Sequence, residues 1–169
     1  RELYHRYNIS FPIEMNLWED KFVCTSLFMN DVKVAYLPIA YYHYDNCSNS
    51  NSIVRNVSKN SIDSQIYYIT HFEGLLNDIK YESLFRDMKL MVKDRAFACR
   101  DLSYKDFINI FPDVNSSFKK SYKLFSCRFY ANFALLIHNI EFPRMLYTLQ
   151  NKILHIVNKE KADIPIKVY

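Results

Sequence analysis

Apolar residues in the last two thirds of the chain recur at helical spacing. Ile62, Ile66, Ile69, Phe72 and Leu76 follow one another at intervals of three or four residues, so they share one face of a helix. Three further stripes have the same period: Leu84, Phe85, Met88, Met91 and Val92; Tyr130, Phe133, Ile137 and Ile140; and Leu146, Leu149, Ile153 and Ile156 or Val157. We expect these stripes to be buried and residues 56–169 to form a bundle of four to five helices.

Two local signals place helix ends within this region. Ser103 followed by Asp106 has the spacing of a capping box, which predicts a short helix that ends before Pro112. Pro143 is suited to the first turn of the last helix, because proline lacks the N–H that a first turn leaves unpaired.

The first third of the chain has a more mixed pattern. Residues 20–29 carry apolar positions at helical spacing, whereas residues 32–38 (VKVAYLP) alternate as in a strand that Pro38 ends. Residues 45–52 (DNCSNSNS) consist of turn-forming residues and predict a loop. The predicted fold is therefore α+β and mainly helical.

Composition excludes several classes of function. The 169 residues include one glycine, Gly74, where ordinary usage would supply about a dozen. Loops that bind phosphate through backbone amides need several glycines, and there is no Asp-x-Asp motif. If the protein handles a nucleotide, the main binding elements lie outside this chain.

The net charge and the cysteines indicate which partners and which cellular compartment to expect. The net charge is +4 and the basic residues are scattered, so we expect no binding to nucleic acid. The four cysteines form no CxxC pair, which favours free thiols in a reducing, cytoplasmic compartment. The best apolar run, residues 129–140, is well short of the roughly 20 residues that cross a bilayer.

A resemblance to a known family enters at Leu17-Trp18-Glu19-Asp20. This run resembles the acidic motif of family-2 glycosyltransferases, which have the GT-A fold. Residues 3–12, with Glu14 after them, resemble the segment that precedes the motif in that family. Residues 32–38, then Tyr42-His43-Tyr44 and the serines before Ile53, resemble the strand and the aromatic segment that follow it. Many members have glycine where this chain has Trp18.

The resemblance implies an inverting transfer of a sugar from a nucleotide sugar to a glycan or a lipid-linked acceptor. It places the general base at Asp20 and an acceptor-contacting or orienting carboxylate at Glu19. The other implied site residues are Trp18, Tyr42 and Tyr44 as substrate contacts and His43 as a metal ligand. A divalent metal, Mn²⁺ or Mg²⁺, is implied as cofactor, with its main ligands outside this chain.

The implied domain organisation divides the chain between residues 55 and 56. Residues 1–55 are the acceptor-side, C-terminal end of a GT-A catalytic domain with a short remnant of its sheet, and residues 56–169 are a helical C-terminal region. The isolated chain is expected to be inactive, because the half that binds the nucleotide sugar is missing from it.

Plainer interpretations stand beside each of these assignments. Glu19 and Asp20 precede a helical pattern, where acidic residues commonly cap helices. The chain is then a non-catalytic helical interaction or scaffold module. Tyr42, His43 and Tyr44 then serve packing alone. The helical tail is a core, packs on the missing catalytic domain, or lies peripherally on the inner face of a membrane that holds lipid-linked acceptors.

Overall fold

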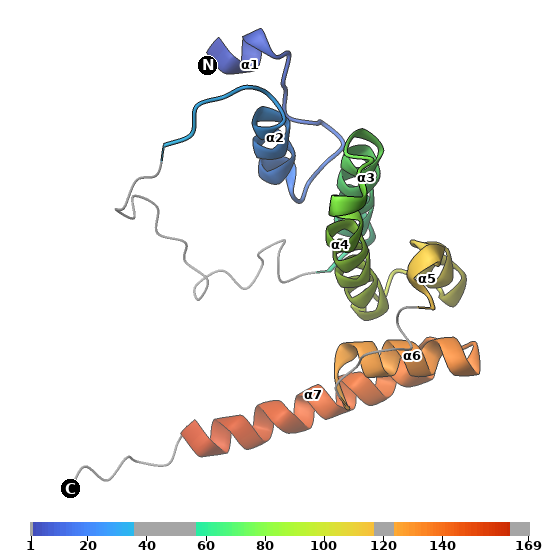
Figure 1. The fold of residues 1–169 in the computed structure, drawn as a ribbon. Coiled ribbons are helices and arrows are strands. Elements are labelled where there is room, and N and C mark those ends of the chain that lie inside the picture. The colour runs from blue at the N-terminus through green and yellow to red at the C-terminus, as the bar shows by residue number, and fades with distance from the viewer. Residues whose placement is uncertain (1, 36–56, 117–123, 163–169) are drawn as a thin grey trace, which may run out of the picture. The chain divides into compact units, whose positions relative to one another are not determined.

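The structure is a computed structural model that describes residues 2–35, 57–116 and 124–162, with side chains as far as residue 156. Within these ranges, every regular element is a helix. In chain order they are α1 (Glu2–Arg6), α2 (Glu19–Phe28), α3 (Lys59–Leu75), α4 (Ile79–Ala98), α5 (Tyr104–Asn109), the short 3₁₀ helix η1 (Pro112–Val114), α6 (Cys127–Ile137) and α7 (Glu141–Ala162) (Figure 1). The prediction of a mainly helical chain is confirmed.

The chain divides into two compact units. The first comprises residues 1–88 and the second residues 89–169. Helix α4 is continuous across the division, so its first half belongs to the first unit and its second half to the second. The division that the glycosyltransferase resemblance implies, between residues 55 and 56, lies outside the described residues and stays a prediction.

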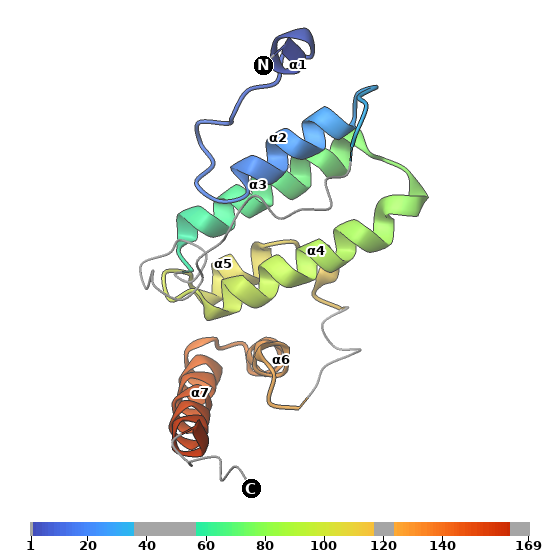
Figure 2. The same ribbon diagram turned by 90° about the vertical axis from the view of Figure 1, so that its left-hand side faces the viewer.

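Packing of α2 against α3 forms the core of the first unit (Figure 2). Helix α3 begins at a capping box between Ser58 and Ser61, which explains where the helical pattern starts. Ile62, Ile69 and Phe72 of the predicted stripe are buried, as expected. The ring of Phe72 lies 5.1 Å from that of Phe22 on α2, between ring centres.

The second unit contains the capping box that the sequence predicts. The Ser103 Oγ accepts from the Asp106 N–H at 3.2 Å, and Asp106 Oδ2 accepts from the Ser103 N–H at 2.9 Å. Helix α5 ends at Asn109, before Pro112. The prediction is confirmed at both ends, because both signals are local to the backbone.

Helix α4 buries part of the predicted stripe and two residues outside it. Phe85 and Val92 of the stripe are buried, whereas Leu84 and Met91 are exposed. Ala96 and Phe97, outside the stripe, are fully buried. Lys93 is also fully buried, and its Nζ donates to the carbonyl oxygens of Phe107 and Ile110 at the end of α5. These carbonyls have no partner within α5, so the ammonium group completes the helix end. Burial lowers the pKa of Lys93 to about 8.

Helix α7 contradicts the sequence prediction most clearly. Leu149, Ile153 and Ile156 are 54%, 52% and 58% exposed, and Leu146 is half-buried, although these residues were predicted to be core. The side of α7 that packs against α4 and α6 instead carries Arg144, Tyr147 and Gln150. Gln150 Oε1 accepts from the Tyr130 hydroxyl of α6 at 2.6 Å. Polar anchors, and not the apolar stripe, therefore set the orientation of α7.

The predicted strand at residues 32–38 is only partly covered by the description. Residues 32–35 are irregular, so the described part forms no strand. Residues 36–38 and the predicted loop at 45–52 lie outside the described residues. A lone strand has no partner for its backbone hydrogen bonds, and an isolated strand is not stable in water.

The three described cysteines are free thiols in very different surroundings. Cys24 is exposed, Cys99 is buried, and Cys127 is half-buried with its Sγ donating to the Asp94 carbonyl at 3.3 Å. Burial, followed by the charge of Asp94, raises the pKa of Cys127 to about 12. Its position in the first turn of α6 would otherwise favour the thiolate.

We expect alkylation by iodoacetamide near pH 8 to discriminate among these thiols. Cys24 should react readily, whereas Cys99 and Cys127 should react only after unfolding in urea, because the thiolate is the reactive form. Peptide mapping by mass spectrometry measures each site separately. Modification of Cys127 in the folded protein as fast as that of Cys24 would contradict the packing of α6 on α4.

Candidate functional site

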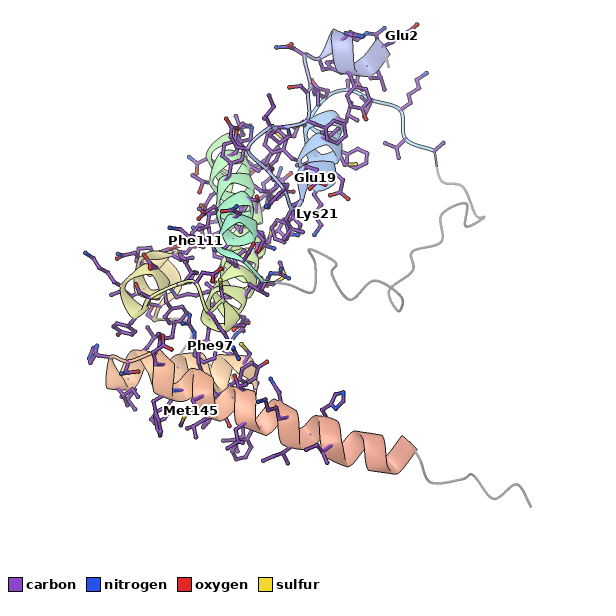
Figure 3. All side chains as sticks on the ribbon, turned by 180° about the vertical axis from the view of Figure 1, so that it is seen from behind. Glu2, Glu19, Lys21, Phe97, Phe111 and Met145 are labelled. Atoms are coloured by element: carbon purple, nitrogen blue, oxygen red, sulfur yellow. The ribbon has the colours of Figure 1, made fainter. Side chains whose placement is uncertain are left out.

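The acidic pair of the motif lies at the start of α2. Glu19 and Asp20 are the first two residues of the helix, and Figure 3 shows Glu19 and Lys21 there. Asp20 is exposed, and its Oδ1 accepts from the backbone N–H of Lys21 at 2.7 Å. A negative charge in this turn interacts favourably with the unpaired N–H groups of the helix start.

Trp18 occupies the N-cap position with an unusual backbone conformation. Its φ of 69° and ψ of 16° are left-handed, and no side chain caps the helix there. An L-residue pays roughly 1–2 kcal/mol for this conformation, whereas glycine adopts it freely. The capping interpretation therefore needs a correction: Asp20 is in the first turn and is not the N-cap residue.

The Trp18 ring is packed against two neighbours. It meets Tyr68 of α3 edge-on with 5.4 Å between ring centres, and the Lys21 Nζ lies 4.4 Å from its centre. The second contact is a cation–π interaction, which at a partly exposed site is worth about 0.5–1 kcal/mol. Trp18 thus has the packing role that its residue type favours, and it remains half-buried beside the acidic pair.

Residues 15–17, before the acidic pair, are buried or hydrogen-bonded to α3. Met15 and Leu17 are buried. Between them, the Asn16 N–H donates to Ser64 Oγ at 3.1 Å, and Ser64 Oγ donates to Asn16 Oδ1 at 3.0 Å. The start of α2 is therefore anchored at two side chains and a hydrogen-bonded pair. Such anchoring is what a side chain needs to act at a defined position.

The conformation of Trp18 leads to a test with two variants. Trp18→Gly and Trp18→Ala both lose the ring contacts, but only alanine is still strained by the left-handed backbone conformation. We expect the glycine variant to be more stable than the alanine variant by about 1 kcal/mol, which reverses the usual order of the two residues. Urea unfolding followed by circular dichroism measures the difference. Equal stability, or a more stable alanine variant, would contradict the left-handed conformation.

The residues that the structure describes do not form a metal site. No group of three or more His, Cys, Asp or Glu side chains comes together in those ranges. Within the described ranges, Glu19 and Asp20 belong to no such group, and the ring of His71 packs on that of Phe22 at 5.0 Å. Tyr42, His43 and Tyr44 lie outside the described residues, so their assignments stay predictions.

A second feature, which sequence reasoning missed, lies on α6 and α7. Exposed apolar side chains line an open groove of about 740 Å³, among them Leu124, Phe125, Leu149, Ile153 and Leu154. The apolar stripe of α7 was visible in the sequence. Its period shows that these residues share a face, but it does not show what covers that face.

Comparison of the chain with models of known protein families, with curated proteins and with solved structures finds no match in any of the three. The resemblance of residues 1–55 to family-2 glycosyltransferases therefore stays a prediction. Among the described helices, none combines the length and the apolar character needed to pass through a bilayer.

Proposed function

We propose that this chain forms the acceptor side of an inverting family-2 glycosyltransferase. The single observation that carries the proposal is the left-handed backbone of Trp18, directly before Glu19 and Asp20. Many members of the family have glycine at this position, and glycine is the residue that a left-handed conformation selects. The same backbone requirement here, in front of the same acidic pair, supports the family's motif over a chance match of letters.

In this proposal Asp20 is the general base. Its exposed carboxylate takes the proton of the acceptor hydroxyl as that oxygen attacks the anomeric carbon and the bond to the diphosphate breaks on the opposite side. General-base assistance of this kind contributes about 10²–10⁴-fold to the rate. Glu19 holds or orients the acceptor. The half-buried ring of Trp18 contacts the sugar at its exposed part, because aromatic rings pack well on apolar sugar faces.

The remaining parts of the enzyme belong to the same proposal. The donor is a nucleotide sugar bound by residues outside this chain, because one glycine cannot build the phosphate loops that binding requires. The divalent metal would neutralise the departing diphosphate, and the described residues supply no site for it. Residues 32–38 would complete a strand against a sheet from the donor half. The acceptor is a glycan or lipid-linked and is met on the cytoplasmic side.

A second candidate is a non-catalytic helical interaction module. The apolar groove on α6 and α7 favours it, because exposed apolar patches mark binding surfaces. Asp20→Asn distinguishes the two candidates in the longer protein that the enzyme proposal requires. Loss of sugar transfer supports the enzyme, and transfer at more than about a tenth of the wild-type rate excludes Asp20 as its base.

A further inference from the structure

The two compact units carry opposite net charges. Residues 1–88 contain 8 Lys and Arg against 11 Asp and Glu, a net charge of −3. Residues 89–169 contain 14 Lys and Arg against 7 Asp and Glu, a net charge of +7. The scattered charge of the whole chain therefore conceals a strongly basic second unit. Such asymmetry points to an anionic partner for that unit.

The same unit presents a continuous apolar face. On α7, Met145, Leu149, Ile153 and Ile156 are all exposed and recur at intervals of three or four residues. Leu124 and Phe125, before α6, extend the face beside the groove. Figure 3 marks the position of Met145 on α7. A monomer in water gains nothing from exposing this much apolar surface in one place.

Basic side chains border the apolar face directly. Lys152 follows Leu149 by three residues and precedes Ile156 by four, so the three lie on neighbouring positions of the helix. Arg100 and Lys152 line a shallow hollow of about 440 Å³ together with Met145 and Leu149. Glu141 also lines this hollow, and its carboxylate is paired with Arg144 at 3.2 Å.

This arrangement selects one kind of partner. Pairing of this face with the same face of a second copy would bring together two units of net charge +7, which opposes self-pairing. Nucleic acid would be bound by charge and stacked bases, and would leave Leu149, Ile153 and Ile156 uncovered. An anionic bilayer surface meets both requirements, because its acyl chains accept the apolar face while its phosphates face the lysine and arginine.

We propose that the second unit docks on an anionic membrane surface through the apolar face of α7 and the adjoining Leu124 and Phe125. Lys152 and Arg100 lie at the level of the headgroups. The inference rests on charge and exposure in residues 89–169 and not on the proposed glycosyltransferase activity.

Vesicle sedimentation with the full 169-residue chain tests this inference. The vesicles contain phosphatidylcholine with about 30% phosphatidylglycerol, or phosphatidylcholine alone. The wild-type chain should bind the anionic vesicles and bind the neutral ones at least tenfold more weakly. Leu149→Ser with Ile153→Ser should lower binding to anionic vesicles by more than tenfold, because two bulky side chains no longer enter the bilayer. Lys152→Glu should lower it by about tenfold.

The chain offers a matched control in the first unit. Ile79 and Leu84 are also exposed apolar residues on a helix, and Ile79→Ser with Leu84→Ser should change binding by less than about twofold. Circular dichroism of each variant confirms that it is folded. Asp20→Asn should bind vesicles normally, so a failure of the enzyme proposal is distinguishable from a failure of this one.

Three results would overturn the inference. One is no binding of the wild-type chain to anionic vesicles. Another is equal binding by wild type and by the Leu149→Ser, Ile153→Ser variant. The third is a dimer in analytical ultracentrifugation that this variant dissociates while vesicles bind neither protein, because the apolar face would then belong to a second copy of the chain.

Discussion

Asp20→Asn is expected to lower sugar transfer by about two orders of magnitude or more in the protein that carries both this chain and a donor-binding half. Asparagine has the shape of aspartate but cannot take the proton of the acceptor hydroxyl. In the first turn of α2 the change also removes a favourable charge, which costs only a few tenths of a kcal/mol. Donor affinity and melting temperature should therefore stay near the wild-type values. Steady-state kinetics measure the transfer rate and the donor affinity, and melting curves check that the variant is folded.

Two companion variants sharpen this experiment. Glu19→Gln should act mainly on the KM of the acceptor if Glu19 only positions it. Asp63→Asn removes an exposed carboxylate from α3 in the same unit and should leave turnover unchanged. A comparable loss of turnover in Asp63→Asn would show that Asp20→Asn reports on net charge and not on a base.

Arg144→Met is expected to lower the free energy of unfolding by about 2–5 kcal/mol. The Arg144 guanidinium is buried and donates to the carbonyl oxygens of Phe97 at 2.6 Å, Leu102 at 2.8 Å and Ala96 at 3.2 Å. The Ala96 carbonyl also accepts from the Cys99 N–H. Methionine would thus leave the carbonyl groups of Phe97 and Leu102 without the Arg144 hydrogen bonds, which destabilises the folded state by about 1–3 kcal/mol for each carbonyl.

Burial lowers the pKa of Arg144 and the Glu141 carboxylate opposes that shift, yet an arginine starts so high that it stays charged at neutral pH. The loss in Arg144→Met is therefore that of a charged donor at the end of α4. Arg100→Met provides the control, because Arg100 is an exposed arginine of the same unit, between α4 and α5, and its loss should shift stability by less than about 0.5 kcal/mol. Stability is measured by urea unfolding followed by circular dichroism. Equal stability of the two variants would contradict this role of Arg144.

The sequence alone predicted the elements whose causes are local. The helix at α5 follows from Ser103, Asp106 and Pro112, which act within a few residues of one another. The stripe of Ile62, Ile69 and Phe72 predicted both α3 and its buried face. For the acidic pair, the pattern after Asp20 predicted a helix and the residues around it predicted a role, but not that Trp18 would precede it in a left-handed conformation.

Tertiary structure decided which faces are buried and which polar groups are satisfied. Lys93 lies on the inner face of α4 because two carbonyls at the end of α5 need a donor, and no spacing within α4 reveals that need. Arg144 likewise turns its side of α7 toward the end of α4 and leaves Leu149, Ile153 and Ile156 exposed. An apolar stripe in the sequence shows which residues share one face of a helix, because helical period is a property of a single segment. What covers the stripe depends on donors and acceptors contributed by segments far away in the chain, and those meet only in the folded protein.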